Sequence, residues 1–265
     1  MTAPAINFTK DAGATNAPAL ATRGLAKSFG SLVVARDIEI KLPKGVRYAL
    51  IGPNGAGKTT LINLMTGMLK PNAGQILLGD EDITSLEPQD RVRRGLARTF
   101  QINTLFPGLN ALEAVTLAVC ERRGISRDFW RNVSEHREAI EEAYDILVKL
   151  RLGDCCYQQT RELPYGRQRL LEIALALATK PKVLLLDEPA AGVPQEESGD
   201  IFEAVAGLSS DLTLLFIEHD MHVVFRFASH IIVLVGGAIF AEGSPAEISA
   251  DPRVREVYLG TRKHG

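Results

Sequence analysis

The chain has 265 residues, of which 46% are hydrophobic and 23% charged, a balance typical of a soluble globular protein with a sizeable core. Its formal net charge of -2 offers no excess of Lys and Arg for neutralising phosphates. This argues against an obligate nucleic-acid-binding protein but leaves a local basic patch open. The sequence contains no run of about 18 apolar residues, so it predicts no membrane-spanning helix.

The N-terminus and the cysteines indicate a protein of the cytoplasm. Residues 1–20 lack the basic start and the unbroken apolar segment of a secretory signal, and their Ala, Thr and Pro content predicts a flexible tail. The cysteines, Cys120, Cys155 and Cys156, are odd in number and lack metal-ligand spacing. This pattern favours reduced thiols over a disulfide framework.

Residues 21–101 form the first of three blocks and mix strand and helix patterns. Segments rich in β-branched residues predict strands over 32–42 and 46–52, and a helix is predicted over 58–69. Another strand is predicted over 74–80, after the turn "KPNAG".

The second block, residues 102–162, is dominated by helical patterns and predicts an inserted helical lobe. Within it, segment 135–152 places five apolar residues at helical spacing on one face, namely Ile140, Ala143, Ile146, Leu147 and Leu150. In the third block, residues 163–265, the runs "VLLLD", "LTLLFIEH" and "HIIVLV" are short, apolar and separated by helical segments. They predict buried parallel strands with crossover helices, and hence an α/β fold.

The segment "GPNGAGKTT" follows a predicted strand, precedes a predicted helix and matches the phosphate-binding loop pattern. Its glycines let the backbone approach anionic oxygens, and the N–H groups of the loop and helix N-terminus supply positive potential. Lys58 is placed to reach the terminal phosphates, and the hydroxyl of Thr59 can ligate Mg²⁺. The predicted nucleotide-binding residues are Gly52, Pro53, Asn54, Gly55, Ala56, Gly57, Lys58, Thr59 and Thr60.

A second motif, "VLLLDEP", ends a predicted buried strand in Asp187 and Glu188. Ligands meet an open parallel sheet at such strand ends, so Asp187 suits the Mg²⁺ shell and Glu188 suits a general base for water. Two acids before a proline also fit a helix-capping turn, but the complete phosphate loop favours the catalytic interpretation. GTPases, kinases, helicases and several ATPase families share both motifs, and the absence of the guanine-reading "NKxD" tetrapeptide disfavours a GTPase.

Four further pieces follow in a fixed chain order. Gln101 ends "GLARTFQ", "LPYGRQ" closes the helical block, "AAGV" follows the acidic pair, and His219 ends "LTLLFIEH". Together with the phosphate loop and the acidic strand end, this order resembles the ATP-binding cassette (ABC) family over nearly the whole chain after residue 20.

The resemblance implies a P-loop NTPase (RecA-like) core of α/β class, with an antiparallel β subdomain and an inserted helical subdomain. It implies one nucleotide-binding domain over residues 21–265. The core and its β subdomain would take residues 21–101 and 163–265, and the helical subdomain would take residues 102–162.

The resemblance also implies roles for single residues, with ATP and Mg²⁺ as cofactors. Gln101 would contact Mg²⁺ or the attacking water, and His219 would contact the γ-phosphate. Phe29 in "KSFG" matches the aromatic residue that stacks on adenine, although the pattern also fits an ordinary core phenylalanine. The implied catalytic residues are Glu188, His219, Gln101 and Lys58, and the implied metal-binding residues are Thr59, Gln101 and Asp187.

The turn "LPYGRQ" differs from the family's commonest signature, "LSGGQ", because Pro164 replaces the serine. The resemblance implies that Tyr165, Gly166 and Arg167 face the ATP held by a second cassette. Proline suits a helix start but has no hydroxyl to offer that ATP. Arg167 and Arg169 lie at a helix N-terminus, where cations oppose the macrodipole. Either their charge substitutes for the missing hydroxyl, or both arginines lie in solvent or pair with nearby acids.

A single cassette without membrane spans resembles the separate ATPase subunit of a bacterial-type transporter. The resemblance therefore implies a second cassette, identical or different, two transmembrane permease subunits and, indirectly, a substrate-binding protein. It implies a peripheral position on the cytoplasmic face of the inner membrane and no nucleic-acid partner. Chromosome-handling members carry long coiled coils and translation members usually carry two cassettes, so a non-transport ABC ATPase is the less favoured alternative.

The wording of "RRGLARTFQ", "IEHDM" and "AEGSPAEISADPRVREVYLG" resembles the ATPase subunits of high-affinity branched-chain amino-acid uptake, the LivG type. Related cassettes serve urea and short amides, and the lipopolysaccharide export ATPase has a similar ending. Both alternatives stay open.

The C-terminal segment "GSPAEI" matches a capping box, with Ser244 as N-cap, Pro245 at the first helical position and Glu247 at the third. A short helix is predicted to start there. The following "VREVYLG" would dock either on the core, the favoured interpretation, or on a partner subunit.

Overall fold

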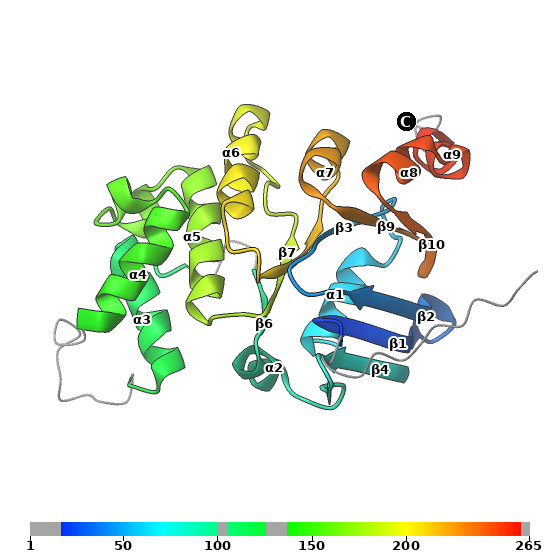
Figure 1. The fold of residues 1–265 in the computed structure, drawn as a ribbon, viewed down its shortest axis with the longest axis horizontal. Coiled ribbons are helices and arrows are strands. Elements are labelled where there is room, and N and C mark those ends of the chain that lie inside the picture. The colour runs from blue at the N-terminus through cyan, green and yellow to red at the C-terminus, as the bar shows by residue number, and fades with distance from the viewer. Residues whose placement is uncertain (1–16, 100–104, 126–136, 261–265) are drawn as a thin grey trace, which may run out of the picture.

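The computed structural model describes residues 17–99, 105–125 and 137–260. Its strands form an antiparallel sheet in the order β2-β1-β4-β5 and a larger sheet in the order β10-β9-β3-β8-β7-β6 (Figure 1). The first sheet contains β1 Leu20–Phe29, β2 Leu32–Leu42, β4 Ala73–Leu78 and β5 Glu81–Asp82. The second contains β3 Arg47–Ile51, β6 Leu96–Arg98, β7 Val183–Asp187, β8 Thr213–Ile217, β9 His230–Val235 and β10 Ala238–Gly243.

The described helices lie on both sides of the larger sheet and at one end of the molecule. Figure 1 places α3 and α4 at one end, away from the antiparallel sheet. The bounds are α1 Lys58–Thr66, α2 Pro88–Arg94, α3 Ala111–Arg123, α4 Arg137–Lys149, α5 Tyr165–Ala178, α6 Gln195–Ala206, α7 Met221–Phe227, α8 Pro245–Ala250 and α9 Pro252–Gly260.

Alternate residues of the parallel strands face two different cores. Along β8, Leu214 and Phe216 belong to the core that contains α5, α6 and α7, whereas Leu215 and Ile217 belong to the core that contains α1 and the antiparallel sheet. Successive strand residues point to opposite faces, so burial on both faces requires a continuous apolar run. The pairings of β3 with β8 and β9, and of β7 with β6 and β8, are all parallel. The predicted α/β sheet of buried parallel strands is confirmed.

The helical block packs α3 and α4 against α5 through one apolar face. On α4, Ala143, Ile146 and Leu147 are buried as predicted, and Leu150 is buried just beyond the helix end. Ile140 is only partly buried, and its neighbour Ala139 is fully buried instead. The predicted face is therefore correct except at its N-terminal end, where it is turned by one residue.

Buried Arg91 of α2 ties the end of α1 to the loop before α2. The predicted helix over 58–69 ends at Thr66, because Gly67 takes the left-handed conformation with φ of 82°. Arg91 is 1% exposed and donates to the carbonyls of Leu64 and Met65 in the last turn of α1. It also donates to the carbonyls of Thr84 and Leu86. One guanidinium thus satisfies four carbonyls around a buried helix end.

Two further features differ from the sequence-based expectation. The tail predicted over 1–20 is too long, because Leu20 is fully buried and begins β1, where it lies opposite Leu42 and Leu78. The three-residue strand β6 was not predicted, since a strand that short carries no usable alternation. Its pairing with β7 extends the parallel sheet by one strand.

The C-terminal capping box is confirmed. The hydroxyl of Ser244 accepts from the N–H of Glu247, and the carboxylate of Glu247 accepts from the N–H of Ser244. Ile248 of α8 and Val254 of α9 are buried in the core that contains α5 to α7. Val254, the first residue of the segment 254–260, therefore docks on the core, as the favoured interpretation predicts.

Replacing Ser244 with alanine should lower the free energy of unfolding by about 1 kcal/mol, because it removes one half of the reciprocal cap. Ser249→Ala is the matched control, since the Ser249 hydroxyl is exposed and only donates to the carbonyl of Ala246 within the same helix. Urea denaturation of both variants measures the difference. Equal stability of the two would show that the cap contributes nothing.

Candidate functional site

The carboxyl ends of three neighbouring strands bring the predicted catalytic residues to one edge of the larger sheet. β8 lies between β3 and β7. The phosphate loop follows β3, Asp187 ends β7 with Glu188 next in the chain, and His219 comes two residues after β8. This edge is where open parallel sheets bind their ligands.

The phosphate loop folds tightly because three of its residues are glycines. Gly55 and Gly57 have φ of 78° and 101°, values that favour glycine. A Cβ on Gly57 would lie 2.5 Å from the carbonyl oxygen of Val34, so a larger residue would displace β2. A Cβ on Gly52 would lie 2.2 Å from the carbonyl oxygen of Leu234. The loop backbone therefore packs closely against β2 of the antiparallel sheet and β9 of the larger sheet.

Lys58 is buried at the start of α1 and folds back over the loop. Its Nζ donates to the carbonyls of Gly52 at 2.8 Å and Pro53 at 3.1 Å. Burial lowers the pKa of Lys58, while the negative charges of Glu188 and Asp187 act in the opposite direction. The two acids and the lysine therefore share one electrostatic site. No side chain caps the N-terminus of α1 and its first turn holds no acid, so its partial positive charge faces the loop.

Glu188 and His219 form a direct contact across two strand ends. The Nε2 of His219 lies 2.5 Å from Oε1 of Glu188. Glu188 has φ of 50°, an uncommon backbone conformation that turns its side chain out of the strand direction. Its N–H donates to the carbonyl of Ile217 at 3.1 Å, which fixes this turn to β8. The two side chains are 32% and 48% exposed, so solvent and ligands reach them.

Asp187 is buried and paired with a cation that the sequence-based prediction missed. Arg98 at the end of β6 donates from Nη2 to the Asp187 carboxylate and from Nη1 to the side-chain oxygen of Asn63 on α1. Arg98 lies in the "ARTFQ" segment, in which only the glutamine was predicted to be a site residue. Gln101 itself lies outside the described residues.

Glu218 is a second residue that the prediction missed. It is 7% exposed, and its carboxylate accepts from the N–H groups of Ala190 and His219. Burial raises the pKa of Glu218, and these two N–H donors oppose that rise. One carboxylate thus connects the turn after Glu188 to the residue that carries the imidazole.

The signature turn starts α5, and its arginines both have acidic partners. Pro164 is the N-cap residue, as its preset φ allows. Arg167 makes a two-pronged ion pair with Asp154, at 2.9 Å and 3.0 Å. Arg169 is buried, pairs with Glu172 at 3.0 Å and donates to the Tyr165 hydroxyl. Both arginines therefore pair with nearby acids in this structure, as the second interpretation describes.

Comparison with known proteins bears on this geometry. The family described as ABC transporter matches residues 35–191, more than half of the chain. The high-affinity branched-chain amino acid transport ATP-binding protein BraF of Pseudomonas aeruginosa is 38% identical over 252 residues, which cover 92% of this chain and 98% of that protein. The chain belongs to the ABC transporter family.

Further comparisons agree that the chain is an ABC ATPase. Its residues 238–264 match the family described as branched-chain amino acid ATP-binding cassette transporter. The protein LivG of Escherichia coli (strain K12), described like BraF, is 37% identical over 250 residues, covering 92% of this chain and 98% of that protein. A crystal structure of an ATP-binding cassette in its ADP conformation matches with a TM-score of 0.80 at 34% identity, covering 91% of this chain and 98% of the other. The predicted family, fold class and ATPase activity are confirmed.

Phe29 lies at the surface of the ABC ATPase and is not a core residue. Its side chain is 52% exposed at the end of β1, and Lys27 places its Nζ 5.3 Å from the ring centroid. The alternative of an ordinary core phenylalanine is wrong, and an exposed ring face is what base stacking requires.

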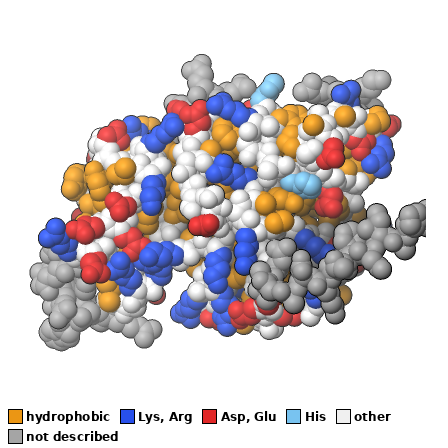
Figure 2. Space-filling view, in the orientation of Figure 1, with side chains coloured by type: hydrophobic (Ala, Val, Ile, Leu, Met, Phe, Trp, Pro, Cys, Tyr) orange, Lys and Arg blue, Asp and Glu red, His pale blue; other side chains and the backbone are white. Residues whose placement is uncertain are grey.

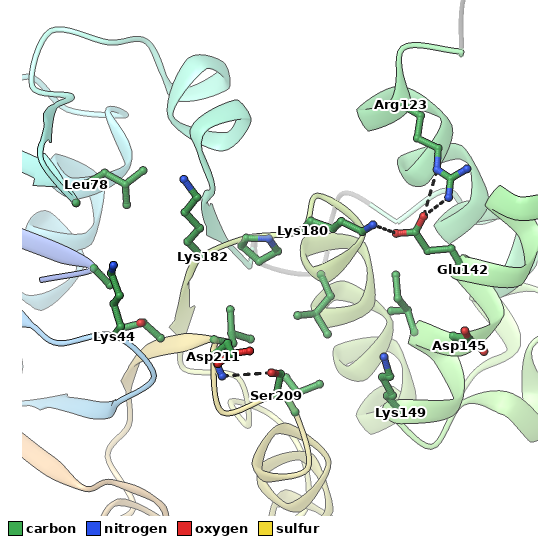
Figure 3. Close-up of a pocket in the computed structure, with 18 of the residues that line it drawn as sticks. Lys44, Leu78, Arg123, Glu142, Asp145, Lys149, Lys180, Lys182, Ser209 and Asp211 are labelled. Atoms are coloured by element: carbon green, nitrogen blue, oxygen red, sulfur yellow. Dashed lines mark hydrogen bonds and ion pairs between the residues drawn. The ribbon is translucent and has the colours of Figure 1, made fainter. Parts of the chain in front are cut away.

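A large cleft lies at the opposite edge of the parallel sheet. It has a volume of about 1220 Å³ and runs between α4 and the segments that precede β7 and β8. Figure 3 shows Lys182 and Lys44 on one wall and Asp145 on the other, with Glu142 paired to Lys180 and Arg123. Lys182 directly precedes β7, so this cleft opens at the amino ends of the strands, away from the phosphate loop.

The described part of the chain holds neither a membrane-spanning helix nor a ready-made metal cage. None of its helices is long and apolar enough to cross a membrane. Within the same residues, no group of three or more His, Cys, Asp or Glu side chains is gathered as a metal cage. Cys120, Cys155 and Cys156 are buried and free.

Proposed function

We propose that this ABC ATPase powers an importer of branched-chain amino acids. The observation that carries the proposal is the match of residues 238–264 to the branched-chain amino acid cassette family, beside the identity with BraF and LivG. The matched segment contains α8 and α9, whose Ile248 and Val254 are buried in the core.

The proposed ATP site uses the loop Gly52 to Thr60, with the adenine stacked on Phe29. The backbone N–H groups, the α1 N-terminus and Lys58 would hold the phosphates. Mg²⁺ is usually held by a few protein oxygens together with waters and substrate phosphates, and not by a cage of protein ligands alone. Thr59, Asp187 and Gln101 would supply such a small set of oxygens. When bound, Mg²⁺ would neutralise charge on the β- and γ-phosphates.

In the proposed hydrolysis step, Glu188 takes a proton from the attacking water through its half-buried carboxylate. The contact between His219 and Oε1 of Glu188 supports this role, because it orients the carboxylate and leaves Oε2 for the water. His219 would then contact the γ-phosphate. The buried Glu218 would hold the backbone of both segments in place.

The proposed assembly contains two cassettes paired head to tail, so that Tyr165, Gly166 and Arg167 of one subunit face the ATP of the other. The second cassette is identical or different, and the pair would bind two permease subunits at the cytoplasmic face of the inner membrane. A substrate-binding protein would act indirectly, and no nucleic acid takes part. Closure on ATP would move the helical subdomain, residues 102–162, against the core, residues 21–101 and 163–265.

Co-purification tests the transporter assignment. The tagged chain, expressed in its own host, should bring down integral membrane proteins from detergent-solubilised membranes in a fixed stoichiometry. Recovery of the chain only from the soluble fraction, without membrane proteins, would contradict the proposal and favour a non-transport ATPase.

A further inference from the structure

Arg98 sits between the acidic strand end and the helix that follows the phosphate loop. Its Nη2 lies 2.5 Å from Oδ2 of Asp187, and its Nη1 lies 2.5 Å from Oδ1 of Asn63. The side chains of Arg98 and Asp187 are 13% and 6% exposed, so water screens the pair weakly. A single guanidinium thereby joins β6, β7 and α1.

The backbone leaves Arg98 little freedom to move away. Arg98 lies opposite Leu185 in the parallel pairing of β6 with β7, and the N–H of Thr99 donates to the Leu185 carbonyl at 3.0 Å. Among the described residues, the buried Nε of Arg98 has no hydrogen-bond partner. A cation held in this way is costly unless a nearby anion offsets its charge, and Asp187 is the anion in contact with it.

The same carboxylate is the one proposed to bind Mg²⁺, so this step rests on the proposed function. Two cations that converge on one carboxylate repel each other, and in a shielded site that repulsion is strong. We propose that Arg98 is a positioning residue that holds Asp187 in the metal-free site and competes with Mg²⁺ for it. Arg98 thereby sets the metal concentration at which this subunit forms its metal–nucleotide complex.

The sign of the effect follows from both states of the site. Without the Arg98 charge, the metal-free state keeps a buried carboxylate that has lost its paired guanidinium and retains only the longer-range attraction of Lys58. The metal-bound state loses a repulsive neighbour. Both changes favour the metal, so removing the charge should tighten metal binding rather than weaken it. A purely structural role for Arg98 predicts the reverse, because a loosened Asp187 would bind metal less well.

The test is metal binding to the full-length chain with a non-hydrolysable ATP analogue, with Mn²⁺ as the probe. Free Mn²⁺ is measured by electron paramagnetic resonance, and analogue affinity in EDTA is measured separately. Arg98→Gln should lower the Mn²⁺ dissociation constant roughly tenfold, the scale of one charge-assisted hydrogen bond. The affinity for the analogue in EDTA should stay unchanged.

Three further variants keep the result interpretable. Arg98→Lys keeps the charge and should bind Mn²⁺ about as the parent does. Arg94→Gln removes an arginine that pairs with Glu81 on the surface and should change nothing. In the Asp187→Asn background, Arg98→Gln should give no tenfold gain. Unchanged or weaker Mn²⁺ binding by Arg98→Gln would overturn the inference while leaving the proposed function intact. A parent chain that binds no ATP analogue would contradict both.

Discussion

Replacing Glu188 with glutamine should lower ATP turnover about a hundredfold to ten-thousandfold and leave ATP binding intact, since that is the range of a general base. Glutamine keeps the size of the side chain and can still contact His219, but it cannot take a proton from water. The loss should therefore appear in turnover and not in nucleotide affinity. The measurement is phosphate release by the assembled transporter, with the other cassette inactivated so that only this site contributes.

Glu203→Gln is the matched control for that experiment. Glu203 lies on α6, and its carboxylate pairs with Arg226 and Arg151 at the surface. Its substitution should leave turnover within twofold or so, because exposed ion pairs contribute little. A Glu188→Gln complex that hydrolyses ATP as fast as the parent would remove Glu188 from the proposed chemistry.

Replacing Arg91 with methionine should destabilise the folded chain by about 3 kcal/mol, a large effect for one residue. Methionine fills much of the same volume but removes the donor to the carbonyls of Met65, Thr84 and Leu86. The carbonyl of Leu64 also loses this donor and keeps only the N–H of Gly67. Two of these carbonyls end α1, so the helix that carries Lys58 should loosen as well.

Chemical denaturation of the Arg91→Met variant measures that loss directly. Arg93→Met is its control, because the Arg93 side chain is 73% exposed and only pairs with Asp90. We expect the control to stay within about 0.5 kcal/mol of the parent. If the two variants unfold at the same denaturant concentration, the four carbonyls have other partners in solution and Arg91 is not a structural residue.

Features built from residues close together in the chain were predictable from the sequence, whereas contacts between residues far apart in the chain were not. The phosphate loop, the buried strands and the Ser244 capping box follow from local spacing, and the structure contains each of them. The pairing of Arg98 with Asp187 spans 89 residues and depends on strand β6, which the sequence pattern does not reveal. A basic residue at the end of so short a strand gives no sign in the sequence of which acid it will contact.

In the signature turn, the sequence did not show which of two arginines would be buried. Arg167 and Arg169 look alike in the sequence, two positions apart at a helix start. In the folded chain Arg169 is buried against Glu172, whereas Arg167 is at the surface with Asp154, 37% and 64% exposed respectively. The packing of α5 against its neighbours makes Arg169 a buried structural residue and leaves Arg167 where a second cassette could reach it.

The central claim is that this subunit powers uptake of branched-chain amino acids. Its most direct test is uptake of labelled leucine, isoleucine and valine by vesicles that contain the complete transporter, its binding protein and internal ATP. We expect uptake that needs ATP and is abolished by Glu188→Gln in this subunit. Uptake of urea or a short amide in their place, or leucine uptake unaffected by Glu188→Gln, would contradict it.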